Sequence, residues 1–166
     1  MRNYKSYKEF FSKKDHKEPL GKGKRLCIVV SLFNKDITDE LLWGAKECLA
    51  QYGVEEGDLD CIVVPGAFEL PLAVQVVMKT KRYDAIVALG CVIRGETPHF
   101  NYICENAASG IMRMMEEHSI PVGFGLLTTE NKQQALARSR KDQTNKGWEA
   151  AESALAMNYL LTEVIR

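Results

Sequence analysis

Short apolar runs, separated by segments of helical periodicity, recur along most of this chain. Four of these runs are continuous rather than alternating, and they cover residues 26–30, 59–64, 85–90 and 122–127. A continuous apolar run of this length is typical of a strand that is buried on both faces of a sheet. The pattern therefore predicts four buried strands.

Helical patterns lie between and after these runs. Apolar or small side chains recur at helical spacing from Leu41 to Tyr52, and Gly53 follows as a stop signal. Pro71 suits the first turn of a second helix, because the N–H that proline lacks has no partner there in any helix. Further helices are predicted over residues 100–118, over residues 130–140 and from about residue 145.

The alternation of strands and helices predicts one parallel sheet with helices on both faces. In such sheets ligands bind beyond the carboxyl ends of the strands, near the point where the strand order reverses. The informative residues are therefore those that follow each strand. They are residues 31–34, 65–69, 91–99 and 128–130.

Two of these strand ends carry groups that can bind an organic ligand. Phe33 comes where the first strand should turn, so its ring either offers a flat face to a planar ligand or packs on the next helix. Glu69 comes at the start of a helix, where it either caps the helix N-terminus or binds ligand hydroxyls. The residues alone leave both alternatives open.

The segment after the third strand has the richest chemistry. The backbone N–H groups of residues 95–97 precede a helix and, with the Thr97 hydroxyl, are suited to bind an anion. Of the three histidines, His99 alone is placed for proton transfer. Arg138 and Arg140 lie on the fourth helical pattern, where either one can clamp a phosphate or simply face solvent.

Charge is balanced overall but not along the chain. The 166 residues carry 22 basic and 22 acidic side chains, which argues against nucleic acid as a partner. Residues 1–25 hold nine bases and three acids, whereas the rest of the chain holds 13 bases and 19 acids. We predict that residues 1–24 form a basic arm, either solvated or adding a strand to a neighbouring subunit, and that residues 25–166 form one domain.

The five cysteines are odd in number and include no C-x-x-C pair, which argues against disulfides and against a zinc site. Cys27, Cys61 and Cys91 lie within or at the end of apolar runs, where cysteine behaves as a small hydrophobic residue. No apolar segment reaches the ~20 residues that span a bilayer, and no secretory signal pattern begins the chain. We therefore predict a cytoplasmic protein that contacts no membrane and binds no metal.

Several strings of residues resemble one known family. They are PGAFELP at 65–71, GCVIRGETPHF at 90–100, Phe33-Asn34, and NKG at 145–147 with Arg138 upstream. Their order and spacing are similar to those of the 6,7-dimethyl-8-ribityllumazine synthase family over about residues 26–160. The first two strings are highly specific in combination, whereas the short ones carry little weight alone.

The resemblance implies a flavodoxin-like α/β sandwich of three layers, in which a four-stranded parallel sheet has helices on both faces. It implies a transferase of riboflavin biosynthesis that condenses 5-amino-6-(D-ribitylamino)uracil with 3,4-dihydroxy-2-butanone 4-phosphate. Phosphate and water leave, and 6,7-dimethyl-8-ribityllumazine forms, without a metal or organic cofactor. The implied assembly is a homopentamer, with a decamer or a 60-subunit shell also open. A non-catalytic flavin- or lumazine-binding carrier on the same fold is the alternative.

The resemblance also implies a pyrimidine and ribityl site. The residues that match the family's motifs there are Phe33, Ala67, Phe68, Glu69, Cys91, Val92 and Ile93. Phe33 is expected to stack on the pyrimidine ring, and Glu69 is expected to hold ribityl hydroxyls.

A second group of matching residues is implied to handle the phosphate substrate and the protons. Glu96 and Thr97 are expected to donate backbone N–H groups to the phosphate, and Arg138 to bind it through its guanidinium group. His99 is expected to transfer protons. Phe124 is expected to reach the site from a neighbouring subunit, because sites of this family lie between adjacent subunits.

The chain departs from the family's pattern in three places. Leu32 stands where many relatives have arginine, and Asn101 stands where an acid is common. The Asn101 departure puts in doubt an acid partner that would orient His99. Residues 139–144 lack the glycines that many shell-forming relatives carry, so a pentamer is the firmer expectation.

Overall fold

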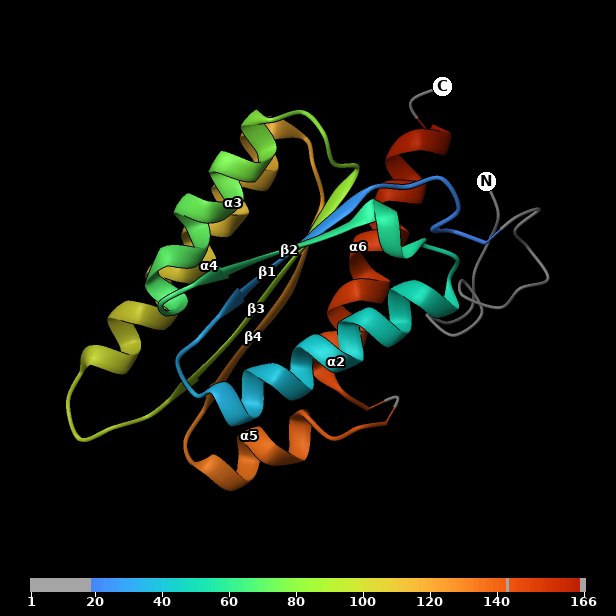
Figure 1. Ribbon diagram of the computed structural model, residues 1–166. Coiled ribbons are helices and arrows are strands. Elements are labelled where there is room, and N and C mark those ends of the chain that lie inside the picture. The colour runs from blue at the N-terminus through green and yellow to red at the C-terminus, as the bar shows by residue number, and fades with distance from the viewer. Residues whose placement is uncertain (1–18, 143, 165–166) are drawn as a thin grey trace.

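The computed structural model describes residues 19–142 and 144–164 (Figure 1). Most of the predicted basic arm lies outside the described residues. The arm and the single domain that should follow it therefore stay predictions.

Four strands form one parallel sheet in the order β2-β1-β3-β4. They are β1 (Leu26–Ser31), β2 (Leu59–Val64), β3 (Ala85–Ile93) and β4 (Val122–Thr129). The chain moves from β1 to β2 on one side and then crosses to β3 on the other. The strand order therefore reverses between β1 and β3, which is where parallel sheets leave a crevice for ligands.

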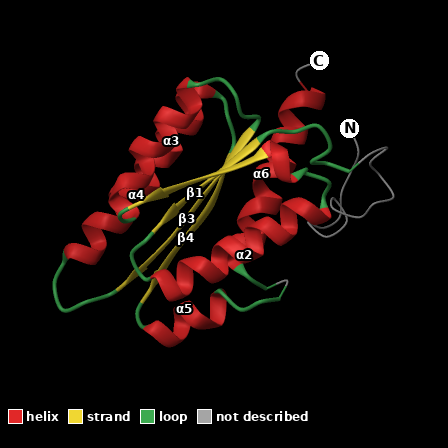
Figure 2. Ribbon diagram, viewed as in Figure 1, coloured by secondary structure: helices red, strands yellow, loops and turns green. Residues whose placement is uncertain are grey.

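Helices cover both faces of the sheet, as Figure 2 shows. Helices α3 (Leu70–Lys79) and α4 (His99–His118) pack on one face, and α2 (Lys35–Gln51) and α6 (Lys146–Val164) pack on the other. Helix α5 (Lys132–Arg138) follows β4. Two short 3-10 turns are formed by Glu56–Asp58 and Ala67–Glu69. This arrangement confirms the predicted flavodoxin-like sandwich with a four-stranded parallel sheet.

The side chains of β1 divide between the two helical layers because successive residues of a strand point to opposite faces. Cys27 and Val29 pack with α3 and α4, whereas Leu26 and Ile28 pack with α2 and α6. Every residue of β1 is buried, and β3 is buried as far as Cys91. The prediction of burial on both faces is therefore confirmed for the two central strands.

The same prediction is wrong for β2. Cys61, Ile62 and Val63 are exposed, and 54% of Val63 is accessible. Strand β2 lies at the edge of the sheet and pairs only with β1 among the described residues. A continuous apolar run shows how hydrophobic a strand is, but not its place in the sheet. The sequence therefore does not distinguish this edge strand from a central strand. The interpretation of Cys61 as a buried hydrophobic residue is wrong for the same reason.

Some element boundaries also differ from the prediction. Strand β3 continues to Ile93, so residues 91–93 belong to the strand rather than to the loop after it. They stay in the sheet because β4 pairs with them as far as Thr129. Helix α5 ends at Arg138, so Arg140 lies beyond the helix rather than on it.

Candidate active site

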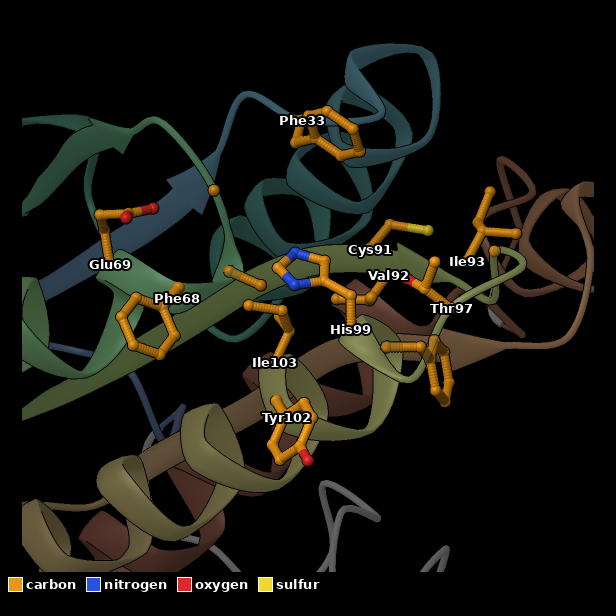
Figure 3. A pocket seen from close by; sticks show the side chains of 14 residues that line it. Phe33, Phe68, Glu69, Cys91, Val92, Ile93, Thr97, His99, Tyr102 and Ile103 are labelled. Carbon is orange, nitrogen blue, oxygen red and sulfur yellow. The ribbon is translucent and has the colours of Figure 1, made fainter.

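A cavity of about 690 Å³ lies beyond the carboxyl ends of β1 and β3. Its walls come from four places in the chain: the end of β1, the 3-10 turn after β2, the end of β3, and the start of α4 (Figure 3). The lining residues are Phe33, Gly66, Ala67, Phe68, Glu69, Cys91, Val92, Ile93, Gly95, Thr97, His99, Phe100, Tyr102 and Ile103. The cavity is therefore placed where the reversal of strand order predicts a ligand.

Phe33 presents its ring to this cavity. Its backbone N–H donates to the carbonyl of Pro65 at 3.1 Å, which carries the β1–β2 pairing past the end of β1. The side chain remains 70% exposed. Of the two alternatives for this residue, a ring available to a planar ligand agrees better with this exposure than a ring packed on α2.

Glu69 lies in the 3-10 turn before α3, and its carboxylate lines the cavity (Figure 3). It occupies the N-cap position of α3, but its side chain makes no capping hydrogen bond. A Cβ at Gly66 would lie 3.2 Å from Glu69 Oε2, so the glycine leaves room for the carboxylate. The carboxylate therefore lies at the start of α3 without a capping hydrogen bond, and it faces the space that a ligand would fill.

The end of β3 supplies one wall. Cys91 is buried, and Val92 and Ile93 are half-buried. Burial is the main cause that raises the pKa of the Cys91 thiol to about 11, with Asp36 and Cys104 adding to the effect. The thiol is neutral at physiological pH, so Cys91 contributes wall and backbone groups rather than a nucleophile.

The loop from Gly95 to Pro98 leads into α4 and brings Thr97 and His99 to the cavity. His99 is the first residue of α4, and its imidazole is exposed to the cavity (Figure 3). Glu96 is exposed in the same loop but is not one of the lining residues. The role expected of Glu96 is a backbone one, which does not need its side chain in the cavity.

Arg94, just before this loop, bonds to the first turn of α4 and to the residue that follows β4. Its Nε donates to Glu130 at 2.7 Å, and its Nη1 donates to Asn101 Oδ1 at 2.9 Å. The guanidinium group also lies 4.1 Å from the centroid of the Phe100 ring, which is cation–π geometry. Asn101 is thus a hydrogen-bond acceptor for Arg94. An acid at this position would form an ion pair with Arg94.

Phe124 and Arg138 do not line the main cavity. They line a second hollow of about 300 Å³ over β4, together with Lys146 and Glu149. Among the described residues, no lining residue of one hollow also lines the other. Arg140 does not line the second hollow, so the structure distinguishes the two arginines that the sequence left as alternatives. The predicted site residues of one chain therefore form two separate groups.

Tyr102 and Ile103 line the cavity but were not identified from the sequence. They lie three and four residues after His99 in α4, so they share the face of the helix that His99 occupies. The helical spacing from His99 is the signal that would have found them.

Within residues 19–142 and 144–164, no group of three His, Cys, Asp or Glu side chains is arranged to hold a metal ion. None of the helices described for this chain is long and apolar enough to cross a membrane.

A comparison with protein families returns the family that the sequence motifs resemble. The family model described as 6,7-dimethyl-8-ribityllumazine synthase matches residues 23–162. The match includes all four strands of the sheet and every residue that lines the two hollows. The chain therefore belongs to the 6,7-dimethyl-8-ribityllumazine synthase family of transferase-type enzymes, which act in riboflavin biosynthesis.

Proposed function

We propose that this protein condenses 5-amino-6-(D-ribitylamino)uracil with 3,4-dihydroxy-2-butanone 4-phosphate to form 6,7-dimethyl-8-ribityllumazine, with release of phosphate and water. This is the penultimate step of riboflavin biosynthesis. The observation that carries the proposal is the composition of the main cavity. One space is faced by the exposed ring of Phe33, the Glu69 carboxylate, the His99 imidazole and the loop before α4.

The pyrimidine substrate fits the part of the cavity between β1 and β3. Its ring stacks on Phe33, and the end of β3 offers backbone groups to the ring's polar edge. Ala67 and Phe68 complete this part of the wall. The Glu69 carboxylate accepts hydrogen bonds from the ribityl hydroxyls, since an ionised carboxylate is a strong acceptor.

The phosphate substrate fits the loop before α4. The unpaired N–H groups at the start of a helix favour an anion, and the loop residues Gly95, Glu96 and Thr97 add their own N–H groups. Arg138 supplies the cation, because its planar guanidinium binds phosphate through paired donors.

Arg138 reaches this phosphate only if it comes from a second subunit. It shares the hollow on β4 with Phe124, whose side chain is 44% exposed. We therefore propose a homo-oligomer, a pentamer by family resemblance, in which the β4 hollow of one subunit closes the main cavity of the next. In this arrangement Arg138 and Phe124 enter the site together.

The reaction begins when the primary amine of the uracil attacks the ketone, loses water and forms an imine. Elimination of phosphate then leaves an enol at the hydroxyl-bearing carbon, which tautomerises to a new carbonyl. The ribitylamino nitrogen attacks this new carbonyl, and loss of a second water completes the ring. Holding two reactants together can contribute ~7–11 kcal/mol to such a reaction. His99 adds proton transfer at or below about 100-fold, the low end of what general acid–base catalysis supplies.

The direct test is to mix the purified protein with both substrates. We expect a yellow, fluorescent product and one phosphate released for each product formed, well above the uncatalysed rate. Binding of the lumazine without accelerated product formation would instead identify a non-catalytic carrier and would reject the enzymatic proposal.

Phe33 provides a test of the pyrimidine site. We expect Phe33→Trp to keep activity and Phe33→Ser to weaken binding of the ribitylamino-uracil about 30-fold, because stacking of a base on an aromatic ring contributes ~1–3 kcal/mol. Isothermal titration calorimetry measures this affinity. Leu32→Ser is the matched control, since Leu32 is also an exposed apolar residue, next to Phe33, but does not line the cavity. Unchanged affinity in Phe33→Ser would remove the stacking role.

A further inference from the structure

The residue after Phe33 has an unusual backbone conformation. Asn34 lies between β1 and α2 with φ 59° and ψ 48°, in the left-handed region. Asparagine tolerates this region better than most residues, although it still costs more there than glycine. Asn34 is the last of the three residues that connect β1 to α2, and it directly follows Phe33.

The side chain of Asn34 does not do what an N-cap side chain usually does. An N-cap asparagine normally accepts a hydrogen bond from a backbone N–H of its own helix. Asn34 makes no such bond. Its Nδ2 donates instead to the carbonyl of Cys91 at 2.9 Å, 57 residues further along the chain.

This bond continues the link between the central strands beyond their ladder. The described pairing of β1 with β3 ends at Val30 and Leu89. The Asn34 amide then bonds Cys91, which is two residues past the last pair in β3. Phe33 is tied to the end of β2 by its own backbone N–H, and through its neighbour it is tied to the end of β3.

Phe33 and the end of β3 are two walls of the same cavity. The width of the slot between them must match the thickness of a planar ring. Only the Asn34 amide directly bonds the Phe33 turn to this part of β3 in the hydrogen bonds recorded for the described residues. The hydrogen bond from Asn34 to Cys91 is therefore suited to control the width of the slot.

We propose that Asn34 is a positioning residue for the pyrimidine substrate. Through its bond to Cys91 it sets the separation between the Phe33 ring and residues 91–93, without touching the substrate. The identity of the substrate rests on the proposed function, whereas the control of the slot width rests on the geometry alone.

Two variants separate the role of the side chain from the role of the backbone. Asn34→Gly keeps the left-handed conformation without strain and removes the amide. Asn34→Asp keeps a side chain of the same shape but directs a carboxylate oxygen, which cannot donate, at the Cys91 carbonyl. Asn131→Gly is the matched control, because Asn131 caps α5 through an ordinary bond from the Gln134 N–H.

We expect the Kd for the ribitylamino-uracil to rise about tenfold in Asn34→Gly and at least as much in Asn34→Asp, as the loss of one well-placed hydrogen bond implies. The KM for the butanone phosphate should change less than twofold in both variants. Asn131→Gly should leave both values unchanged. An unchanged Kd in Asn34→Gly, or an equal rise in the two substrate constants, would overturn the proposal.

Amide hydrogen exchange tests the tie without any substrate. Peptides that cover residues 31–38 and 89–94 should exchange faster in both Asn34 variants than in the parent protein and the Asn131→Gly control. Unchanged exchange would overturn the proposal even if the enzyme is active. A parent protein that forms no product would reject the proposed function, while the exchange result would still decide whether Asn34 holds the slot.

Discussion

Arg138→Ala is expected to lower kcat/KM for the butanone phosphate about 500-fold, which corresponds to about 3.7 kcal/mol. His99→Ala is expected to lower it no more than about 100-fold. Steady-state kinetics with the second substrate held at saturation measures both values.

The larger effect follows from the charge of the substrate. A phosphate without its cation leaves two negative charges in a closing site, and truncating one member of a buried charge pair costs ~2–5 kcal/mol. Arg138 is already oriented, because its Nη1 donates to the carbonyl of Gln134 at 3.0 Å. Four of its five N–H donors remain for the phosphate.

His99 contributes less because the chemistry needs less help. An amine adds to a ketone without a strong catalyst, so most of the rate acceleration is expected from holding the two substrates together. In the proposed mechanism His99 moves protons during imine formation and dehydration, and water can partly replace it in that role.

Arg140→Ala is the matched control for Arg138→Ala. Arg140 lies two residues beyond the end of α5, is exposed, and does not line the β4 hollow. Its truncation should change kcat/KM less than twofold. If His99→Ala costs more than Arg138→Ala, the account in which proximity dominates is wrong.

Asn145→Ala is expected to lower the free energy of unfolding by about 4 kcal/mol, the largest stability effect that we predict. Asn145 is fully buried before α6. Its Nδ2 donates to the carbonyls of Glu40 and Arg140, each at 2.9 Å. Its Oδ1 accepts from the N–H groups of Gly147 and Trp148. Truncation would remove the partner of four backbone groups at once, of which the two N–H groups are buried and the two carbonyls are partly buried.

The positions around Asn145 are closely packed. A Cβ at Gly44 would lie 2.3 Å from Asn145 Oδ1, and a Cβ at Gly147 would lie 2.0 Å from the carbonyl oxygen of Leu41. Both glycines let α6 approach α2 at this point. The close approach of α6 to α2 also sets the position of the Lys146 backbone. Lys146 lines the β4 hollow together with Arg138.

Urea unfolding at one fixed protein concentration measures the loss, since the apparent stability of an oligomer depends on concentration. Asn145→Asp is the graded control: it keeps the oxygen that accepts from α6 and loses the two donors, so it should lose about half as much. A loss below 1 kcal/mol in Asn145→Ala would show that these four bonds contribute little to the folded state.

Asn145 and Gly147 also explain part of the family motif in physical terms. In the sequence, NKG is only a short string that matches the family's pattern. The structure gives the asparagine and the glycine a packing role, and only Lys146 between them faces a hollow. A motif read from the sequence does not separate residues that contact a ligand from residues that hold them in place.

The sequence by itself determined the alternation of strands and helices, the parallel sheet and the family. Apolar runs and helical spacing are local properties, so they can be read from neighbouring residues. The sequence also identified the segments around Phe33, Glu69 and His99, because parallel strands always present their carboxyl ends at one edge.

Only the tertiary structure decided how these segments meet. The exposure of Val63 depends on what lies beside β2, and the pairing of Asn34 with Cys91 joins residues 57 positions apart. Phe124 and Arg138 are separated from the main cavity because β4 lies at the edge of the sheet, next to β3. Contacts of this kind form between distant parts of the chain, and no local pattern of hydrophobic and polar residues records them.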